Sequence, residues 1–270
     1  MKNIVDIGIK AARTAGEFLS KNSNKEKNIY LKNDRSLVTE FDSKAEKIIV
    51  DIIRSEFPTH SILAEEGNNI TFSNEYLWII DPIDGTHNFI RGIPLYGVSI
   101  GVVYQNNFVA GIIYMPTEKD LYVSEKGNGA YKNNTSIKVS DKNNMNECTL
   151  SFDSGFRKDI ELKTGVLKVL AKRVFNIRML GASTTLLTYL AEGKIDISVE
   201  FDDEPWDFAA GASLVTEAGG KFTDFEGREA TFQTKGYICS NGIIHSDVID
   251  IIHPLRISLS IQKNDRSIKE

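Results

Sequence analysis

Cysteine is scarce in this sequence, and its two copies, Cys148 and Cys239, lie far apart without the spacing of a metal-binding motif. We therefore expect two reduced thiols rather than a disulfide framework or a zinc site. No segment approaches the roughly 18 consecutive apolar residues of a membrane-spanning helix. Charges interrupt the apolar positions of residues 1–20, which therefore do not resemble a signal peptide. These absences predict a cytoplasmic protein without membrane contact.

An excess of positive charge is also absent. The chain has 32 Lys and Arg against 37 Asp and Glu, which gives a net charge of −5. This balance argues against a nucleic-acid partner that depends on a basic face. The 270 residues, 41% of them apolar, are enough for a large core in an ordinary soluble globular protein.

Helical and strand periodicities alternate along the chain without a low-complexity linker. The apolar spacing predicts helices at residues 5–19, 41–57, 160–174, 183–191 and 208–218. Short apolar runs predict strands at residues 61–64, 76–80, 97–104, 108–114, 121–124, 149–152, 177–180 and 195–201. Residues 105–107 have the composition of a hairpin turn. Residues 22–36 are polar and predict an exposed connection.

The alternation of elements predicts an α/β (α+β) fold in two halves. We expect an N-terminal half at residues 1–142 with most of the acidic site residues, and a C-terminal half at residues 143–255 that completes the substrate pocket. The sequence assigns no structure to the tail at residues 256–270.

The segment 78–89 carries the strongest chemical signal. An apolar run ends in Asp81 and Asp84, and a Gly85-Thr86 pair follows. This pattern is typical of a buried strand that presents carboxylate ligands for a divalent cation at a turn. Gly85 permits a close approach of the backbone, so the N–H groups of Gly85 and Thr86 can point at phosphate oxygens. An ordinary strand exit with an Asp-Gly turn is the alternative.

Further acidic residues stand at the ends of apolar elements. Asp42 and Asp207 each begin a predicted helix, and Glu65-Glu66 ends a predicted strand. Each alone is as expected for a helix cap or a surface charge. Together they favour a cation site at one edge of a sheet, because a cluster of like charges there needs a metal.

Three segments resemble the signature segments of the inositol monophosphatase family. They are Glu65-Glu66-Gly67, Trp78-Ile79-Ile80-Asp81-Pro82-Ile83-Asp84-Gly85-Thr86 and Trp206-Asp207-Phe208-Ala209-Ala210-Gly211. The resemblance extends to about Ile252, and it implies a five-layered αβαβα sandwich that is usually a homodimer. The same superfamily contains the fructose-1,6-bisphosphatases.

The resemblance implies two to three Mg²⁺ ions. Glu65, Asp81 and the Ile83 carbonyl would bind the first ion. Asp81, Asp84 and Asp207 would bind the second, and Glu65 would also bind a third, looser ion. Two cations roughly 3.5 to 4 Å apart can clamp a phosphomonoester, activate a water molecule and neutralise the leaving oxygen. Inhibition by lithium is implied as well.

The catalytic residues implied by the resemblance are Asp42, Thr86 and Glu65. Asp42 and Thr86 would orient and deprotonate the attacking water. Residues 32–39 resemble the family's mobile loop near the third metal, and their polar composition suits a closing element.

The resemblance also implies substrate contacts. Asp84, Gly85, Thr86 and Asp207 would contact the phosphate end. Glu200 matches a position that accepts hydrogen bonds from sugar or inositol hydroxyls, and Gly181, Ala182 and Ser183 match a helix start that lines the same pocket. The alternative readings are a strand-end charge and an ordinary helix N-terminus.

A second phosphate of the substrate would be held by basic residues in the region of Arg157, Lys158, Arg173 and Arg178. Arg178 is the preferred candidate, because it shortly precedes Gly181.

Two features depart from the family pattern. His87 replaces a threonine that is common in relatives, and it is expected to face away, because Mg²⁺ prefers oxygen ligands. The acidic run 202–204 would disfavour densely charged substrates if it borders the pocket. A solvated turn is the alternative for this run.

Three functions remain open. The first is a Mg²⁺-dependent phosphatase of inositol monophosphate, fructose 1,6-bisphosphate or both. The second is a 3'(2'),5'-bisphosphate nucleotidase on the same scaffold. The third is a non-catalytic binding protein, which ranks last because Asp42, Glu65, Asp81, Asp84, Thr86 and Asp207 are all present.

Overall fold

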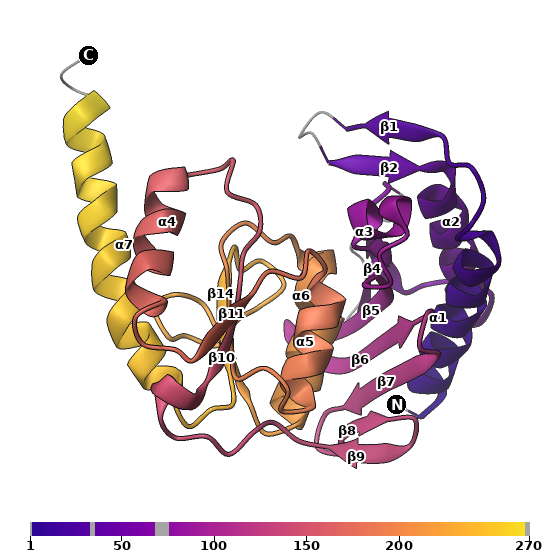
Figure 1. Cartoon of the computed structure of the whole chain (residues 1–270). Coiled ribbons are helices and arrows are strands. Elements are labelled where there is room, and N and C mark those ends of the chain that lie inside the picture. The colour runs from indigo at the N-terminus through magenta and orange to yellow at the C-terminus, as the bar shows by residue number, and fades with distance from the viewer. Residues whose placement is uncertain (1, 33–35, 68–75, 268–270) are drawn as a thin grey trace.

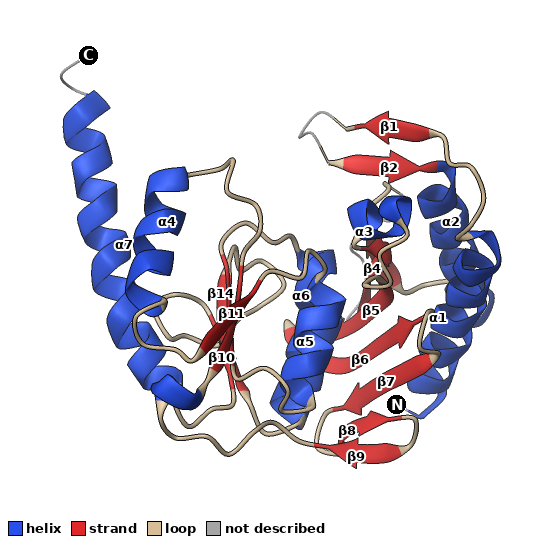
Figure 2. Cartoon of the chain, in the orientation of Figure 1, coloured by secondary structure: helices blue, strands red, loops and turns tan. Residues whose placement is uncertain are grey.

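The computed structural model describes residues 2–32, 36–67 and 76–267, and it stacks their helices and sheets in five layers (Figure 1). Helices α1 (Lys2–Asn22) and α2 (Glu40–Glu56) cover one face of a seven-stranded sheet. Helices α5 (Ser183–Ala191) and α6 (Pro205–Glu217) form the central layer. A five-stranded sheet follows, and α4 (Ile160–Leu170) and α7 (His245–Ser267) cover its outer face (Figure 2). The predicted αβαβα sandwich is confirmed.

The seven-stranded sheet runs in sequence order from one edge to the other. Its strands are β3 (Ser61–Ala64), β4 (Tyr76–Asp84), β5 (Gly97–Tyr104), β6 (Asn107–Met115), β7 (Asp120–Glu125), β8 (Gly129–Lys132) and β9 (Thr135–Ile137). Only β3 and β4 are parallel, and the rest form an antiparallel meander. The predicted hairpin turn has Gln105 and Asn106 at positive φ, as a tight two-residue connection requires. The sequence interpretation missed β8 and β9.

The five-stranded sheet has the order β11-β10-β12-β14-β13. Its strands are β10 (Thr149–Phe152), β11 (Asn176–Arg178), β12 (Ile197–Glu200), β13 (Lys221–Thr223) and β14 (Tyr237–Ser240). Strand β10 is parallel to both neighbours, whereas β14 is antiparallel to β12 and β13. Alternate residues such as Leu150 and Val199 pack in the outer core, so the intervening side chains face the central helices.

Two segments differ from what the sequence predicted. Residues 22–36 were expected to be an exposed connection, and they include strand β1 (Ile29–Leu31), which is exposed and pairs with β2 (Leu37–Thr39). The implied loop 32–39 therefore lies in this hairpin, with residues 33–35 outside the described residues. The tail, which received no prediction, continues α7 through Pro254 to Ser267, and residues 268–270 lie outside the description. No helix of the described residues is long and apolar enough to cross a membrane.

Helix α6 lies close against the seven-stranded sheet because glycine occupies the contact positions. A Cβ atom at Gly101 of β5 would lie 2.6 Å from Ala209 Cβ, and one at Gly111 of β6 would collide with the Ala210 carbonyl oxygen. Neighbouring α6 residues are small as well, so helix and sheet backbones approach each other. This contact fixes where the first turn of α6 sits relative to β4 and β5.

The link between the two sheets is held by Asp196. Its buried carboxylate accepts hydrogen bonds from Ser140 Oγ at 2.5 Å, Thr149 N at 2.7 Å and Lys142 Nζ at 3.0 Å. These partners belong to the linker after β9 and to the first residue of β10. One carboxylate thus joins the linker to the five-stranded sheet.

We predict that Asp196→Ala lowers the free energy of unfolding by about 2–4 kcal/mol, because several donors lose a buried charged acceptor. Asp51→Asn, which removes an exposed carboxylate paired with Lys47 on α2, should change it by less than about 0.5 kcal/mol. Urea unfolding at pH 7.5 measures both variants. Equal stability of the Asp196 variant and the parent would contradict this role.

Candidate active site

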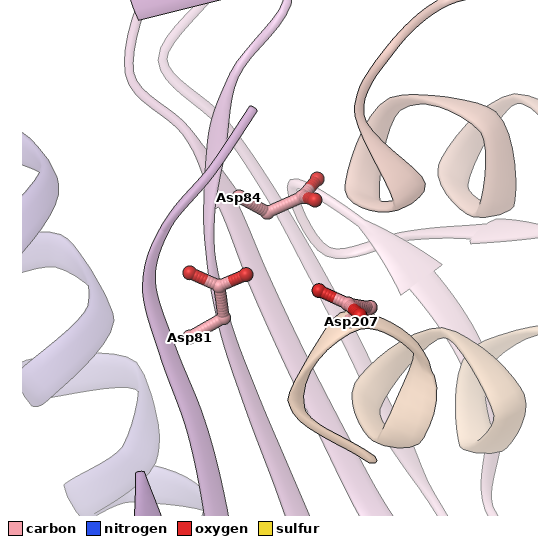
Figure 3. Close-up of side chains that lie close together, drawn as sticks. All are labelled: Asp81, Asp84 and Asp207. Atoms are coloured by element: carbon pink, nitrogen blue, oxygen red, sulfur yellow. The ribbon is translucent and has the colours of Figure 1, made fainter. Parts of the chain in front are cut away.

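The site begins with an irregularity in β4. Asp81 and Asp84 are three residues apart, so in a regular strand their side chains would point to opposite faces of the sheet. The β4–β5 pairing shifts register between these two residues, and Pro82 provides no backbone donor there. Both carboxylates consequently reach the same place, beside the start of α6 (Figure 3).

Asp207 joins them from the first turn of α6. Its Oδ2 accepts the Glu204 N–H at 2.7 Å, and its own N–H bonds to the Glu204 carbonyl, so it completes a capping box. Figure 3 shows its carboxylate pointing towards Asp81 and Asp84. One oxygen from each of the three carboxylates lies within 4.8 Å of the others. This separation suits a shared cation.

The protein withdraws these carboxylates from water. Asp81 is 2% exposed and Asp84 is 5% exposed. Burial raises the pKa of Asp81 well above its usual value, and the charges of Glu65, Asp84 and Asp207 raise it further. Burial also raises the pKa of Asp207, and it raises the pKa of Asp84 to about 6 although hydrogen bonds from Thr184 and Ser183 oppose the shift. Clustered carboxylates in this state favour a proton or a cation between them.

Glu65 approaches the cluster from the end of β3. Its N–H donates to the Ile80 carbonyl at 3.2 Å, one residue before Asp81. Buried Glu46 of α2 accepts the Glu66 N–H at 2.7 Å and so fixes the same turn. Lys32 Nζ, at the end of β1, lies 2.8 Å from Glu65 Oε1 and 2.6 Å from Glu66 Oε1.

Lys32 provides a cation at this edge of the cluster. Burial alone would lower the pKa of Lys32, but the carboxylates of Glu65 and Glu66 raise it above its usual value. Lys32 stays charged at neutral pH, and it brings the β1–β2 hairpin against the acidic site.

Asp42 and Thr86 form a direct pair. Thr86 Oγ1 lies 3.0 Å from Asp42 Oδ1 and 2.9 Å from the Ile83 carbonyl oxygen. The other Asp42 oxygen accepts the N–H and hydroxyl of Thr39, so Asp42 completes the capping box at the start of α2 and contacts Thr86 through its first oxygen. Burial raises the pKa of Asp42, and hydrogen bonds from Thr39 and Thr86 oppose the shift.

Asp84 connects the two sheets through α5. Its carboxylate accepts the N–H of Ser183 at 3.1 Å, the N–H of Thr184 at 2.6 Å and the Thr184 hydroxyl. Gly85 follows at φ +83°, and a Cβ there would lie 2.9 Å from Ala182 Cβ. Only glycine therefore suits this close passage of the backbone beside the start of α5.

Two adjoining cavities open from the cluster. The first, of about 470 Å³, is lined by Glu65, Asp81, Ile83 and Thr86, among others. The second, of about 450 Å³, is lined by Glu200, the Gly181–Ser183 segment, Asp202 and Asp203, among others. Both are bordered by Ser36, Asp84, Arg157, Gly181 and Asp207. The structure thus places most of the predicted residues around one continuous space.

Several carboxyl groups line the second cavity, among them Asp153, Glu200 and Asp203. Glu200 is 6% exposed, and its pKa is raised well above the usual value by burial and by the charges of Asp203 and Asp153. Asp203 accepts the Ser183 hydroxyl at 2.9 Å, and burial raises its pKa to about 7. Asp202 and Asp203 of the run 202–204 therefore border the pocket, so the run is not a fully solvated turn.

Arg178 and His87, two residues singled out in the sequence, are both exposed and lie outside the acidic cluster. Arg178 is exposed, bonds through Nη1 to the Ile177 carbonyl and lines neither cavity as the described residues outline them. Arg157 lines both cavities instead. His87 is exposed at the margin of the first cavity.

The sequence interpretation missed Thr184, Glu46, Asp153 and Lys163. Asp153 follows β10 directly, and this strand-end position is the same signal that identified Glu65. Lys163 lies on the inner face of α4 and carried no signal of its own.

The chain matches the model of the inositol monophosphatase family over residues 1–256. It belongs to the inositol monophosphatase family. A "Fructose-1,6-bisphosphatase/inositol-1-monophosphatase" of Thermotoga maritima is 36% identical over 92% of this chain and 95% of its own length. A "Nus factor SuhB" of Pseudomonas aeruginosa is 36% identical over 88% of this chain and 91% of that one. The solved inositol monophosphatase of Anabaena superposes with a TM-score of 0.85 at 32% identity, covering 94% of this chain and 96% of the other.

Membership of the inositol monophosphatase family relates this chain to phosphatases. The family is one of phosphatases, and the acidic cluster of Asp81, Asp84 and Asp207 is able to hold a metal ion.

We predict that Asp81→Asn stabilises the metal-free protein at pH 7.5 by about 0.5–2 kcal/mol, as happens when a strained functional group is neutralised. A raised carboxyl pKa means that the folded state binds protons more tightly than the unfolded state. The destabilisation of the folded state by the ionised Asp81 carboxylate is therefore fully present above the folded-state pKa, and it declines as the pH falls through that pKa. Asn removes this cost and can still accept the Ile83 N–H bond that Asp81 Oδ1 receives at 2.9 Å.

Thermal unfolding in EDTA and in Mg²⁺ measures both effects. The parent should gain stability from Mg²⁺, and the variant should gain much less. A variant less stable than the parent in EDTA, with Asp51→Asn unchanged, would contradict a repulsive cluster.

Proposed function

We propose that this chain is a Mg²⁺-dependent phosphomonoesterase that hydrolyses phosphate esters of inositol or sugars. The supporting observation is the convergence of three carboxylates with raised pKa values, buried Asp81 and Asp84 and half-buried Asp207, beside Glu65 and the Asp42–Thr86 pair. Every candidate ligand atom is a carboxylate or carbonyl oxygen, the donor type that Mg²⁺ prefers. The residues therefore fit the ion that the family resemblance implies.

The residues divide between two ion positions. Glu65, Asp81 and the Ile83 carbonyl oxygen would hold one ion, and Asp81, Asp84 and Asp207 would hold the other. Ions bound there supply the charge that activates a water molecule and neutralises the leaving oxygen of a phosphomonoester.

Asp42 and Thr86 act on the attacking water in this proposal. The Thr86 hydroxyl is within hydrogen-bond reach of Asp42 Oδ1, so it can pass a proton to Asp42 while its oxygen accepts one from water. Burial raises the pKa of Asp42, which brings it closer to the value of an effective general base at neutral pH. The Thr39 bonds hold the Asp42 carboxylate in this orientation.

Substrate binding is assigned to both cavities. The phosphate would lie over the first cavity, near Gly85 and Thr86. The remainder of the ester would extend into the second, where Glu200 and the Gly181–Ser183 segment line the space. The name of the Thermotoga relative supports inositol monophosphate and fructose 1,6-bisphosphate as the first substrates to test.

A non-catalytic role is the second candidate, because the Pseudomonas relative bears the name of a Nus factor. A chain that only binds a partner has no need of the Asp42–Thr86 pair or of clustered carboxylates. Their presence together favours the enzyme.

We predict that the purified chain releases phosphate from inositol 1-phosphate in Mg²⁺ and not in EDTA. Thr86→Val should lower kcat by about 10²–10⁴-fold, because the water loses its link to Asp42. The variant should keep its stabilisation by Mg²⁺, since no carboxylate changes. Thr14→Val, which removes an exposed hydroxyl on α1, serves as the matched control.

Adenosine 3',5'-bisphosphate belongs in the same assay, because its preferential hydrolysis would indicate the nucleotidase. Absence of turnover with every ester in Mg²⁺ would refute the enzyme proposal. Near-parental turnover by Thr86→Val would refute the assignment of Thr86.

A further inference from the structure

A third cavity lies away from the acidic cluster, and we call it the distal cavity. Its volume is about 570 Å³, and the described residues that line it belong to neither cavity of the candidate active site. Its lining combines α6 around Thr216 with the start of β6, the segment 220–223 and the first turn of α7. Thr216 follows Asp207 by nine residues, so it lies about 14 Å along α6 from the cluster.

Much of the lining of the distal cavity is apolar. Phe108 and Phe222 contribute to it together with Ala212 and Ile249. Both phenyl rings pack on buried Phe208, whose ring centroid lies 6.3 Å from that of Phe108 and 5.7 Å from that of Phe222. Rings held in place by such packing present a fixed apolar surface, which suits the apolar body of a small ligand.

Buried His245 contributes an uncharged part of the lining. Its Nε2 lies 2.9 Å from Thr223 Oγ1, and its Nδ1 lies 2.8 Å from Ser240 Oγ. Burial and the charge of Lys221 lower the pKa of His245 to about 4. The imidazole is therefore neutral at pH 7 with both ring nitrogens already bonded, and it offers no charge to a ligand.

Two lysines supply the positive charge of the lining. Lys126 precedes Gly127, whose N–H bonds to Glu217 in the last turn of α6. Lys221 follows Gly220, whose N–H bonds to a carbonyl oxygen of α6. Both lysines thus lie beside the C-terminal end of α6, both are exposed, and neither pairs with a carboxylate of the described residues. Their ammonium groups are available to an anion.

Two carboxylates also line the distal cavity. Glu217 accepts the Gly127 N–H at 3.0 Å through Oε1 and the Gly129 N–H at 2.9 Å through Oε2, so backbone donors already offset its charge. Glu229 is exposed in the loop after β13, where water and salt screen it. The two lysines are therefore the charged groups best placed to recognise a ligand.

We propose that the distal cavity is a second ligand site, which takes a small organic anion with a flat apolar body. Phe108 and Phe222 would contact the body, and Lys126 and Lys221 would contact the anionic head group. Because α6 lines this cavity at one end and carries Asp207 at the other, an occupant would contact the same helix as the acidic cluster. The inference does not depend on the phosphatase proposal.

The probe is naphthalene-2-sulfonate, and naphthalene-2-sulfonamide is its uncharged counterpart of nearly the same shape. Titration calorimetry of the full chain in EDTA keeps the probe from the acidic cluster, whose carboxylates repel anions when no metal is bound. The chain should bind one sulfonate, at least about fivefold more tightly than the sulfonamide. Added salt should narrow this difference, because both lysines are exposed.

Thr216→Trp places a large ring in the distal cavity from an exposed position of α6. It should weaken the binding of both probes by at least about tenfold, because the ring occupies their space. Thr14→Trp makes the same change at an exposed position of α1 outside the cavity, and its affinity should equal that of the parent. Circular dichroism and thermal unfolding check that both variants fold.

Charge variants test the head-group contacts. Lys126→Gln combined with Lys221→Gln should abolish the preference for the sulfonate, whereas Glu229→Gln should increase it by about twofold. All three side chains are exposed, so the fold should tolerate these changes.

A crystal soaked with naphthalene-2-sulfonate should show the probe against Phe108 and Phe222. Absence of binding, equal affinity of the parent and Thr216→Trp, or equal affinity for the sulfonate and the sulfonamide would overturn the inference. Density for the probe only outside the distal cavity would overturn it as well. Phosphate release is measured separately, so the phosphatase proposal is decided independently of this result.

Discussion

Electrostatic repulsion between buried carboxylates is the constraint on which this site depends. Asp81, Asp84 and Asp207 are brought together by packing that forms the fold itself: the register shift in β4, the close contact of α6 with β5 and β6, and the hydrogen bonds from the first residues of α5 to Asp84. The raised pKa values of these side chains show that the folded chain holds them at a cost. A divalent cation would relieve this repulsion, so the relief adds to the free energy of metal binding.

The same residues connect the two sheets. Asp84 belongs to the seven-stranded sheet but caps the N-terminus of a central helix, and Asp207 begins the other central helix. Movement of either sheet relative to the central layer would therefore disturb the cluster. The hydrogen bonds of Asp196 to Ser140 and Thr149 also hold the linker between the two sheets against the five-stranded sheet. Stability and site geometry are thus properties of one packing arrangement.

The sequence predicted the elements whose signals are local. Strands β3, β5, β10 and helix α5 have the predicted bounds, because each is an apolar run with clear flanking residues. The β1–β2 hairpin and the strands β8, β9, β13 and β14 were missed, since strands of three or four residues carry little periodicity and depend on their partners for stability.

Some residues of the candidate site could likewise be predicted from local sequence signals, and others could not. Residues at the ends of apolar elements, such as Asp81 and Asp207, stood out in the sequence. Lys163 did not, because its ion pairs are with Asp153 and Asp202 of two other segments. Arg178 was preferred for its position before Gly181, yet its strand turns the side chain to solvent and leaves Arg157 beside both cavities. Neighbours in sequence do not determine which side chains share a cavity.

The most direct test of the account is a crystal structure with Mn²⁺, a cation that prefers the same oxygen ligands as Mg²⁺ and is located by anomalous scattering. We predict anomalous density for Mn²⁺ at this cluster, where Glu65 and Asp81 would hold one ion and Asp81, Asp84 and Asp207 would hold another. Absence of ions from this cluster at saturating Mn²⁺, or ions bound only elsewhere, would contradict the central claim that the buried carboxylates form a two-metal centre.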